Sequence, residues 1–331
     1  MFRHAIGGLT RSRQALDTRT ARNNGCLESR PQPGEASQMP EDPRVSGLRP
    51  PFRAPQRLGD LDPKPDHGER TYTGSRRLQD YTALVVGGDS GIGRAVAIAF
   101  AREGANIIVS YRADHKGAEE TARWVGASGR QAVLLPGDLN SEDYRRFLIK
   151  RTVEQFGSLE VLVSDAPSIY RCEPAEDKDL SAASIEESIR TGQESVFALS
   201  VLAAEKMKPG ATVIATTLAR SEHSPSLQRA YAAYRGGVLS LTVSLALELA
   251  GLGVRVNAVE PGPVWAPRIL ATLTDRQLAN FGASTLLGRP AQPVELAPAY
   301  VFLASREASF ITGAVLPVTG GQLEPIAANA P

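Results

Sequence analysis

The chain is poor in cysteine, in histidine and in net charge. Its 331 residues include two cysteines, Cys26 and Cys172, and four histidines, without metal-ligand spacing. This composition argues against a disulfide framework or a zinc site, so we expect no metal and a reducing compartment. Basic residues number 37 and acidic residues 36, a net charge of +1. No overall field attracts nucleic acid, and we expect a small-molecule substrate bound at a specific site.

Long uncharged runs are also scarce. Residues 236–254 have the length of a membrane span and contain a single charge, Glu248. Gly, Ser and Thr dilute this window, and a helix that is apolar on most sides more often lies in a core or a subunit interface. We therefore expect a cytoplasmic protein that does not bind a membrane.

The first 80 residues differ in composition from the rest. Nine of the 23 prolines lie between Pro31 and Pro65, amid Arg, Asp, Gln and Gly. Such a segment buries too little apolar surface to order itself. We predict a largely disordered extension over residues 1–80 and a nucleotide-binding domain over residues 81–325.

The extreme N-terminus allows two interpretations. The first 25 residues hold five arginines and one acidic residue, Asp17, which is compatible with an organellar transit peptide. The alternative is an upstream-extended reading frame whose true start is Met39. We favour the second interpretation.

From residue 81 onward, short apolar runs alternate with amphipathic segments, which is typical of strand–helix units around a parallel sheet. The connections in such sheets are right-handed almost without exception. We predict an α/β fold, a single Rossmann-type doubly wound sheet of seven strands with helices on both faces. The expected strands cover residues 82–86, 105–110, 131–136, 159–164, 211–216, 253–259 and 314–318.

A glycine-rich turn follows the first expected strand, where residues 86–100 read VGGDSGIGRAVAIAF. Glycines allow a tight turn and let backbone N–H groups approach a phosphate at the N-terminus of the next helix. The turn therefore predicts a dinucleotide site. The residues expected to contact the dinucleotide here are Gly87, Ser90, Gly91, Ile92 and Gly93.

The GxxxGxG spacing of this turn differs from the Rossmann GxGxxG and resembles the short-chain dehydrogenase/reductase family. Residues 137–139 (GDL) resemble the adenine-contacting motif of that family, and residues 257–264 (NAVEPGPV) resemble its segment beside the nicotinamide. Residues 298–305 with 318–321 match its C-terminal signature. Further cofactor contacts that the resemblance implies are Asp138, Leu139, Ala166, Pro261, Gly262 and Val264.

The resemblance covers residues 80–322 and extends upstream in one branch. Residues 61–75 (LDPKPDHGERTYTGS) resemble the branch with a proline-rich arm, described as uncharacterised or glucose-dehydrogenase-like oxidoreductases. The family resemblance also implies a homotetramer or a homodimer, in which long helices over residues 184–207 and 229–250 pair between subunits. It places substrate specificity in residues 263–284, which we expect to form a flexible lid.

The residues that follow the second expected strand indicate which cofactor the site prefers. An acidic residue there would bind the adenosine ribose and repel a 2′-phosphate, but this chain has Ser110, Tyr111 and Arg112, with Arg94 in the first helix. A guanidinium complements a phosphate. We predict NADP(H) in preference to NAD(H).

Family members generally use Tyr as a general acid or base, Lys to lower its pKa and bind the nicotinamide ribose, Ser to orient the substrate and Asn to hold a water. Tyr231 matches the Tyr, and Arg235 stands at the Lys position one helical turn away. Both are also expected to contact the cofactor. Tyr234 has Val238 four residues later, so we expect it to pack or to lie at the surface rather than to react.

The remaining catalytic positions depart from the family pattern. The usual interval to the Ser places Leu218 at its position, and a one-residue shift places Thr217 there, whose hydroxyl can donate the same hydrogen bond. The Asn position is occupied by Gly192, and the NNAG segment reads SDAP, with Asp165 and Pro167.

Three functions fit these residues. The first is an NADP(H)-dependent oxidoreductase of a small alcohol or carbonyl, with altered or impaired chemistry at Tyr231, Arg235 and Thr217. The second is a catalytically inactive NADP(H)-binding regulatory protein. The third is a dehalogenase, because halohydrin dehalogenases of this fold use Ser, Tyr and Arg, but those proteins replace the nucleotide loop with a halide pocket. We favour the first.

Overall fold

The computed structural model describes residues 42, 45, 47–53, 61–165, 192–193, 195–217, 225–270 and 273–322. A single seven-stranded sheet has the order β3-β2-β1-β4-β5-β6-β7, and every neighbouring pair is parallel. The order of the strands reverses between β1 and β4, because β2 and β3 lie on one side of β1 and β4 to β7 lie on the other. Sheets of this kind bind ligands in the crevice at such a point. The predicted α/β doubly wound fold is confirmed.

All seven expected strands are present, and their ends differ from the expected ones by two residues at most. Aliphatic and β-branched runs that are buried on both faces form strands in a parallel sheet. The strands are β1 Thr82–Val86, β2 Asn106–Tyr111, β3 Ala132–Pro136, β4 Val161–Ser164, β5 Thr212–Thr216, β6 Arg255–Pro261 and β7 Val315–Val318.

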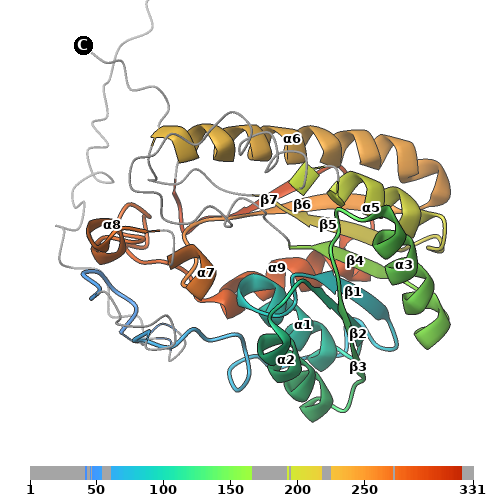
Figure 1. Ribbon diagram of the computed structural model, residues 1–331, viewed down its shortest axis with the longest axis horizontal. Helices are drawn as coiled ribbons and strands as arrows, with labels where there is room; N and C mark the ends of the chain where they lie inside the picture. The colour runs from blue at the N-terminus through green and yellow to red at the C-terminus, as the bar shows by residue number, and fades with distance from the viewer. Residues whose placement is uncertain are drawn as a thin grey trace, which may run out of the picture. The chain divides into compact units, whose positions relative to one another are not determined.

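Helices cover both faces of the sheet (Figure 1). Helices α1, α2 and α9 form one core with the sheet, and α3, α5 and α6 form the other. Ten of the twelve residues of α1 are buried, because this helix lies between the sheet and its neighbours. The helices are α1 Gly91–Arg102, α2 His115–Ala127, α3 Glu142–Phe156, α5 Ser195–Ala204, α6 Pro225–Leu249, α7 Pro267–Leu270, α8 Asp275–Ala279 and α9 Pro293–Ala304, with 3-10 turns at Ala250–Leu252 and Arg306–Ala308.

Residues 61–80, which we call the strap, bind the C-terminal end of α1. The carboxylate of Glu103 is fully buried there. It accepts hydrogen bonds from the Tyr72 hydroxyl at 2.7 Å, the Ser75 N–H at 2.8 Å and the Arg77 guanidinium at 2.7 Å. A buried carboxylate is tolerated only when it is paired and hydrogen-bonded, so Glu103 requires the strap in this position.

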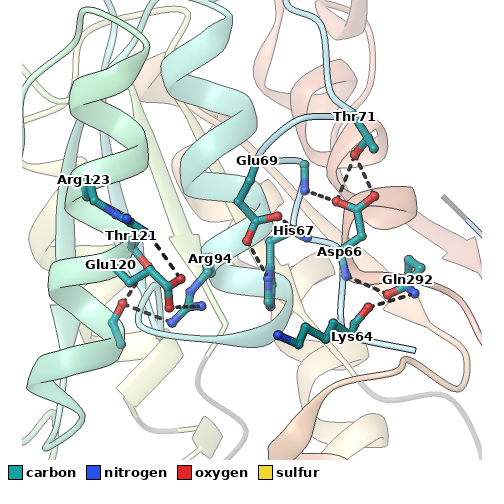
Figure 2. A network of polar contacts seen from close by, with 12 residues as sticks. Lys64, Asp66, His67, Glu69, Thr71, Arg94, Glu120, Thr121, Arg123 and Gln292 are labelled. Carbon is teal, nitrogen blue, oxygen red and sulfur yellow. Dashed lines mark hydrogen bonds and ion pairs between the residues drawn. The ribbon is translucent and has the colours of Figure 1, made fainter. Parts of the chain in front are cut away.

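The strap also binds the N-terminal end of α9. The Asp66 N–H donates to Gln292 Oε1 at 2.8 Å, and the Val294 N–H donates to the Asp66 carbonyl at 3.0 Å. Figure 2 shows Asp66 facing both Gln292 and the Thr71 hydroxyl, which donates to its carboxylate at 2.7 Å. The strap is therefore held at two helix ends that lie far apart in the sequence.

The lid segment, residues 263–284, packs on the N-terminal part of the protein, at Phe52 and at Pro63 of the strap. The Trp265 indole N–H donates to the Pro63 carbonyl at 2.6 Å, and the Phe52 and Trp265 rings lie 4.3 Å apart between centroids. The Phe52 N–H donates to the Ala279 carbonyl at 3.1 Å. Over its described residues, the segment expected to be a flexible lid is thus anchored through a buried tryptophan.

These contacts change the interpretation of the N-terminal extension. Composition assigns residues 1–80 to disordered chain, but residues 61–80 have buried side chains, including Leu61, Tyr72 and Leu78. Composition misleads here because residues 61–80 also form hydrogen bonds to Glu103 and to backbone groups, which a count of hydrophobic residues does not include. The expectation for residues 1–41 lies outside the described residues.

Glu103 makes the strap sensitive to acid. Burial opposes ionisation of this carboxyl, but hydrogen bonds from Arg77, Tyr72 and Ser75 outweigh that effect and lower its pKa to about 2. An unfolded Glu has a pKa of about 4.3. The carboxylate therefore stabilises the fold above pH ~4.3, and this contribution is lost as the pH falls toward 2.

We expect Glu103→Gln to reduce the free energy of unfolding by roughly 2 kcal/mol at pH 7, and by about 1 kcal/mol less at pH 3.5. Urea unfolding of both proteins at the two pH values measures the difference. Glu142→Gln is the matched control, because Glu142 pairs with Arg146 on the exposed face of α3 and little change is expected at either pH. An equal loss at both pH values for Glu103→Gln contradicts the assignment.

Candidate functional site

Glycines shape the turn between β1 and α1. Gly87 has φ of 80° and Gly91 has φ of 54°, values that residues with a Cβ rarely adopt. A Cβ added at Gly93 would lie 2.3 Å from the Gly87 carbonyl oxygen. The turn therefore brings α1 directly against the backbone that leaves β1.

The N-terminus of α1 fits an anion. Ser90 at the N-cap has extended backbone and makes no side-chain capping hydrogen bond, and the first turn contains no acidic residue. The first backbone N–H groups of a helix, here including those of Ile92 and Gly93, have no partner within the helix and carry its positive dipole end. These residues can hold the pyrophosphate of a dinucleotide.

Arg94 supports this turn rather than standing free beside it. Its guanidinium donates to the carbonyls of Asp89 at 2.8 Å and Gly117 at 3.1 Å and pairs with Glu120 at 2.9 Å (Figure 2). Only 11% of the side chain is exposed. Arg94 therefore ties the turn to α2, and the cation expected to bind a cofactor phosphate is left to Arg112.

Arg112 and Asp138 lie near each other at the carboxyl ends of β2 and β3. The nearest charged atoms are 3.9 Å apart, and the side chains are 56% and 43% exposed. An exposed pair at this distance contributes little to stability, so the guanidinium can turn toward a 2′-phosphate. Leu139, the next residue, packs partly buried on the core of α3.

Thr217 lies at the end of β5 and is fully buried. Its N–H donates to the Val259 carbonyl at 2.9 Å, but its hydroxyl has no hydrogen-bond partner among the described residues. Leaving a buried hydroxyl without a partner costs about 1–3 kcal/mol. This supports Thr217 as a group that meets a ligand, whereas Leu218 lies outside the described residues.

Helix α6 carries the Tyr and Arg positions. Tyr231 lies within it, but its side chain is outside the described part of the structure. Tyr234 is 1% exposed, and its hydroxyl donates to the Thr216 carbonyl at 3.4 Å. Of the two expected roles for Tyr234, packing and surface exposure, the structure shows packing.

Arg235 forms an ion pair that the sequence motifs did not reveal. Its Nε and Nη2 atoms lie 3.2–3.3 Å from the two carboxylate oxygens of Glu260, near the end of β6. The signal in the sequence is an acidic residue, Glu260, in a strand that is almost entirely buried, next to the Pro261–Gly262 pair. The cation at the Lys position is therefore bound to a carboxylate.

The Asn position provides no side chain. Gly192 is buried, and the next residue, Gln193, reaches back to α6, where its amide donates to the Ala233 carbonyl at 2.9 Å. Asp165 follows β4, and its N–H donates to the Val86 carbonyl at 3.0 Å. Ala166 and Pro167 lie outside the described residues.

The segment after β6 is closely packed. The Gly262 N–H donates to the Val318 carbonyl at 2.9 Å, and a Cβ at Gly262 would lie 2.7 Å from Thr319 Cα. Val264 is fully buried and pairs with Ala291 in an isolated bridge. Pro261 and Gly262 thus hold the chain at the sheet edge, while Val264 serves packing.

All described candidates come from one edge of the sheet. They follow the carboxyl ends of parallel strands or lie on α1 and α6, which border the same edge. No three His, Cys, Asp or Glu side chains gather as a metal site among the residues that the structure describes. The edge therefore offers backbone N–H groups, an arginine beyond β2, a buried threonine and an Arg–Glu pair.

Comparison with known proteins identifies the family of this chain. A family model described as enoyl-(acyl carrier protein) reductase matches residues 86–322. The chain belongs to the short-chain dehydrogenase/reductase family. It is 37% identical to "Uncharacterized oxidoreductase YhdF" of Bacillus subtilis, over 86% of this chain and 98% of that protein. The suspected family and branch are confirmed, and with them the class of NAD(P)-binding oxidoreductases.

Two further comparisons name a cofactor for the matched protein. The chain is 35% identical to "NADPH-dependent aldehyde reductase 1, chloroplastic" of Arabidopsis thaliana, over 79% of this chain and 92% of that protein. A solved short-chain dehydrogenase of Burkholderia cenocepacia, in complex with NADP, superposes with a TM-score of 0.66 at 26% identity. That match covers 74% of this chain and 99% of the solved one.

The Gly93 contact yields a direct test of the cofactor turn. Gly93→Ala places a methyl group against the Gly87 carbonyl, so we expect at least tenfold weaker dinucleotide binding, measured by calorimetry. Gly126→Ala is the control, because a Cβ there meets nothing within 4 Å and α2 gains a better helix former. Unchanged affinity in the Gly93 variant would show that the dinucleotide does not bind at this turn.

Proposed function

We propose that the protein is an NADP(H)-dependent oxidoreductase that interconverts a small alcohol and its carbonyl. The observation that carries this proposal is the α1 turn with Arg112, an exposed cation, where an NAD-preferring site would place an acid. The NADPH-dependent relative from Arabidopsis thaliana supports the choice of cofactor. It also favours an aldehyde as the substrate class.

In this proposal the cofactor supplies or accepts the hydride, and the chain handles the proton. Tyr231 donates a proton to the carbonyl oxygen during reduction and removes it during oxidation. Arg235 holds a positive charge one helical turn from Tyr231, and the Thr217 hydroxyl orients the substrate oxygen. Asp138 and Leu139 border the adenine, and Pro261 and Gly262 border the nicotinamide half.

A second candidate is a catalytically inactive NADP(H)-binding regulatory protein. Two observations favour it, the missing side chain at Gly192 and the neutralisation of Arg235 by Glu260. Loss of one oriented donor in a site of this kind costs roughly 10²- to 10³-fold in rate. The first candidate is therefore proposed with impaired or altered chemistry. The dehalogenase alternative requires a halide pocket in place of the α1 turn and is not favoured.

We propose a homotetramer or homodimer in which α5 and α6 pair between subunits. Residues Ala233–Leu252, which cover much of α6 and the following 3-10 turn, are apolar and long enough to cross a membrane, and 28% of that window is buried. Val243 and Leu247 are 50% and 77% exposed on this helix. A second subunit, rather than a membrane, is proposed to cover them, in a cytoplasmic protein that does not bind nucleic acid.

Arg112→Asp tests the cofactor preference. The carboxylate repels a 2′-phosphate and can accept a hydrogen bond from a ribose hydroxyl, so we expect NADPH affinity to fall roughly 50-fold and NADH affinity to fall far less. Fluorescence titration with both cofactors measures the two constants. Equal losses for NADPH and NADH would remove Arg112 from the phosphate site.

Tyr231→Phe separates the enzyme from the binder. Since the phenol carries the proton, we expect turnover of small aldehydes with NADPH to fall about 10²-fold or more while the Kd of NADPH changes little. Tyr234→Phe is the control for removal of a phenol from the same helix, because the Tyr234 hydroxyl is buried and donates to the Thr216 carbonyl. NADPH binding without turnover in the wild-type protein would favour the regulatory function.

A further inference from the structure

The Arg235–Glu260 pair is a largely buried ion pair at the candidate site. Both carboxylate oxygens of Glu260 lie within 3.3 Å of the guanidinium. The Glu260 side chain is 12% exposed and that of Arg235 is 30% exposed. A planar guanidinium and a carboxylate at these distances hold each other in one orientation. The two residues therefore act as one electrostatic unit.

The topology places this pair on the nicotinamide side of the crevice. The dinucleotide crosses the sheet edge at the switch point between β1 and β4. Its adenosine half lies toward β2 and β3, where Arg112 and Asp138 stand, so its nicotinamide half lies toward β5 and β6. Thr217 and Glu260 are at the ends of these two strands. This placement rests on the proposed function, because it requires a bound dinucleotide.

We propose that Glu260 is a positioning residue that fixes Arg235 and cancels its charge toward the nicotinamide. The oxidised nicotinamide ring is positively charged and the reduced ring is neutral. An unpaired guanidinium nearby would weaken binding of the oxidised form, and an unpaired carboxylate would strengthen it. With both present, the site discriminates little between the two forms.

Other charged and polar groups at this edge are the same in the wild-type protein and in the variants compared below. Asp165 at the end of β4 is close enough to raise the pKa of Tyr300, whose burial is the larger cause. Tyr300 on α9 and Tyr234 on α6 are also buried near this edge. These groups are unchanged in the variants below, so their contribution cancels in ratios between variants.

The test is the ratio of Kd for NADP⁺ to Kd for NADPH, measured by calorimetry on the purified protein without substrate. We expect Glu260→Gln to raise this ratio roughly five- to tenfold, since it removes the negative charge of Glu260 and leaves the positive charge of Arg235 in place. Arg235→Gln leaves the carboxylate unpaired and should lower the ratio by a similar factor. The double variant should return the ratio to within about twofold of the wild type.

Control variants separate electrostatics from structural damage. If Glu260 has a purely structural role, its replacement weakens binding of NADP⁺ and NADPH equally and leaves the ratio of the two Kd values unchanged. That result would overturn the proposal. Glu260→Asp keeps the charge and should keep the ratio even if both affinities fall. Glu295→Gln breaks a comparably buried pair, Arg289–Glu295 at 2.8 Å on α9, and should not change the ratio.

The outcomes also distinguish this inference from the proposed function. Wild-type protein that binds neither NADP⁺ nor NADPH rejects the dinucleotide site and the inference together. Binding with unmoved ratios in both single variants rejects only the role of Glu260. Binding with opposite shifts but without turnover supports the charge pair and favours the regulatory function over the enzyme.

Discussion

The contact between α1 and the turn that leaves β1 is the constraint on which the site depends. Only a glycine at position 93 allows the helix to lie against the Gly87 carbonyl. Thr121 on α2 supports the same turn from behind, where its hydroxyl donates to the Gly88 carbonyl at 2.8 Å. Because ten residues of α1 are buried, the helix cannot shift without repacking one whole face of the sheet.

The two ends of α1 serve different parts of the molecule. Its N-terminus offers N–H groups to an anion, and Glu103 at its C-terminus binds the strap. The strap continues to Pro63, whose carbonyl accepts a hydrogen bond from Trp265 in the lid segment. The lid segment is thus linked to the cofactor turn through one rigid helix and a buried carboxylate. A strap of low hydrophobicity can do this because its bonds to Glu103 are charge-assisted and shielded from water.

The sheet was predictable from the sequence because five of its strands, β1, β2, β4, β5 and β6, are short runs of almost entirely buried residues. The turn between β1 and α1 was predictable because local steric contacts require its glycines. The strap and the Arg235–Glu260 pair were not predictable, because both depend on charged groups that meet only in the folded chain. Arg77 and Glu103 are 26 residues apart in the sequence, and Arg235 and Glu260 are 25 residues apart. Position 217 illustrates a third limit. Its role depends on a one-residue shift in register, and the unpartnered buried hydroxyl is what favours Thr217 over Leu218.

The departures from the family pattern share one electrostatic consequence. On the side proposed to bind the adenosine, Arg112 is exposed and lies 3.9 Å from Asp138, so its guanidinium can meet a phosphate. On the nicotinamide side the cation at the Lys position faces a carboxylate at 3.2 Å. A phenol titrates near pH ~10 and needs a net positive neighbour to ionise near neutrality, and a guanidinium paired with Glu260 supplies less of that charge. We therefore propose that the cofactor binds through the α1 turn and Arg112, while proton transfer at Tyr231 limits turnover.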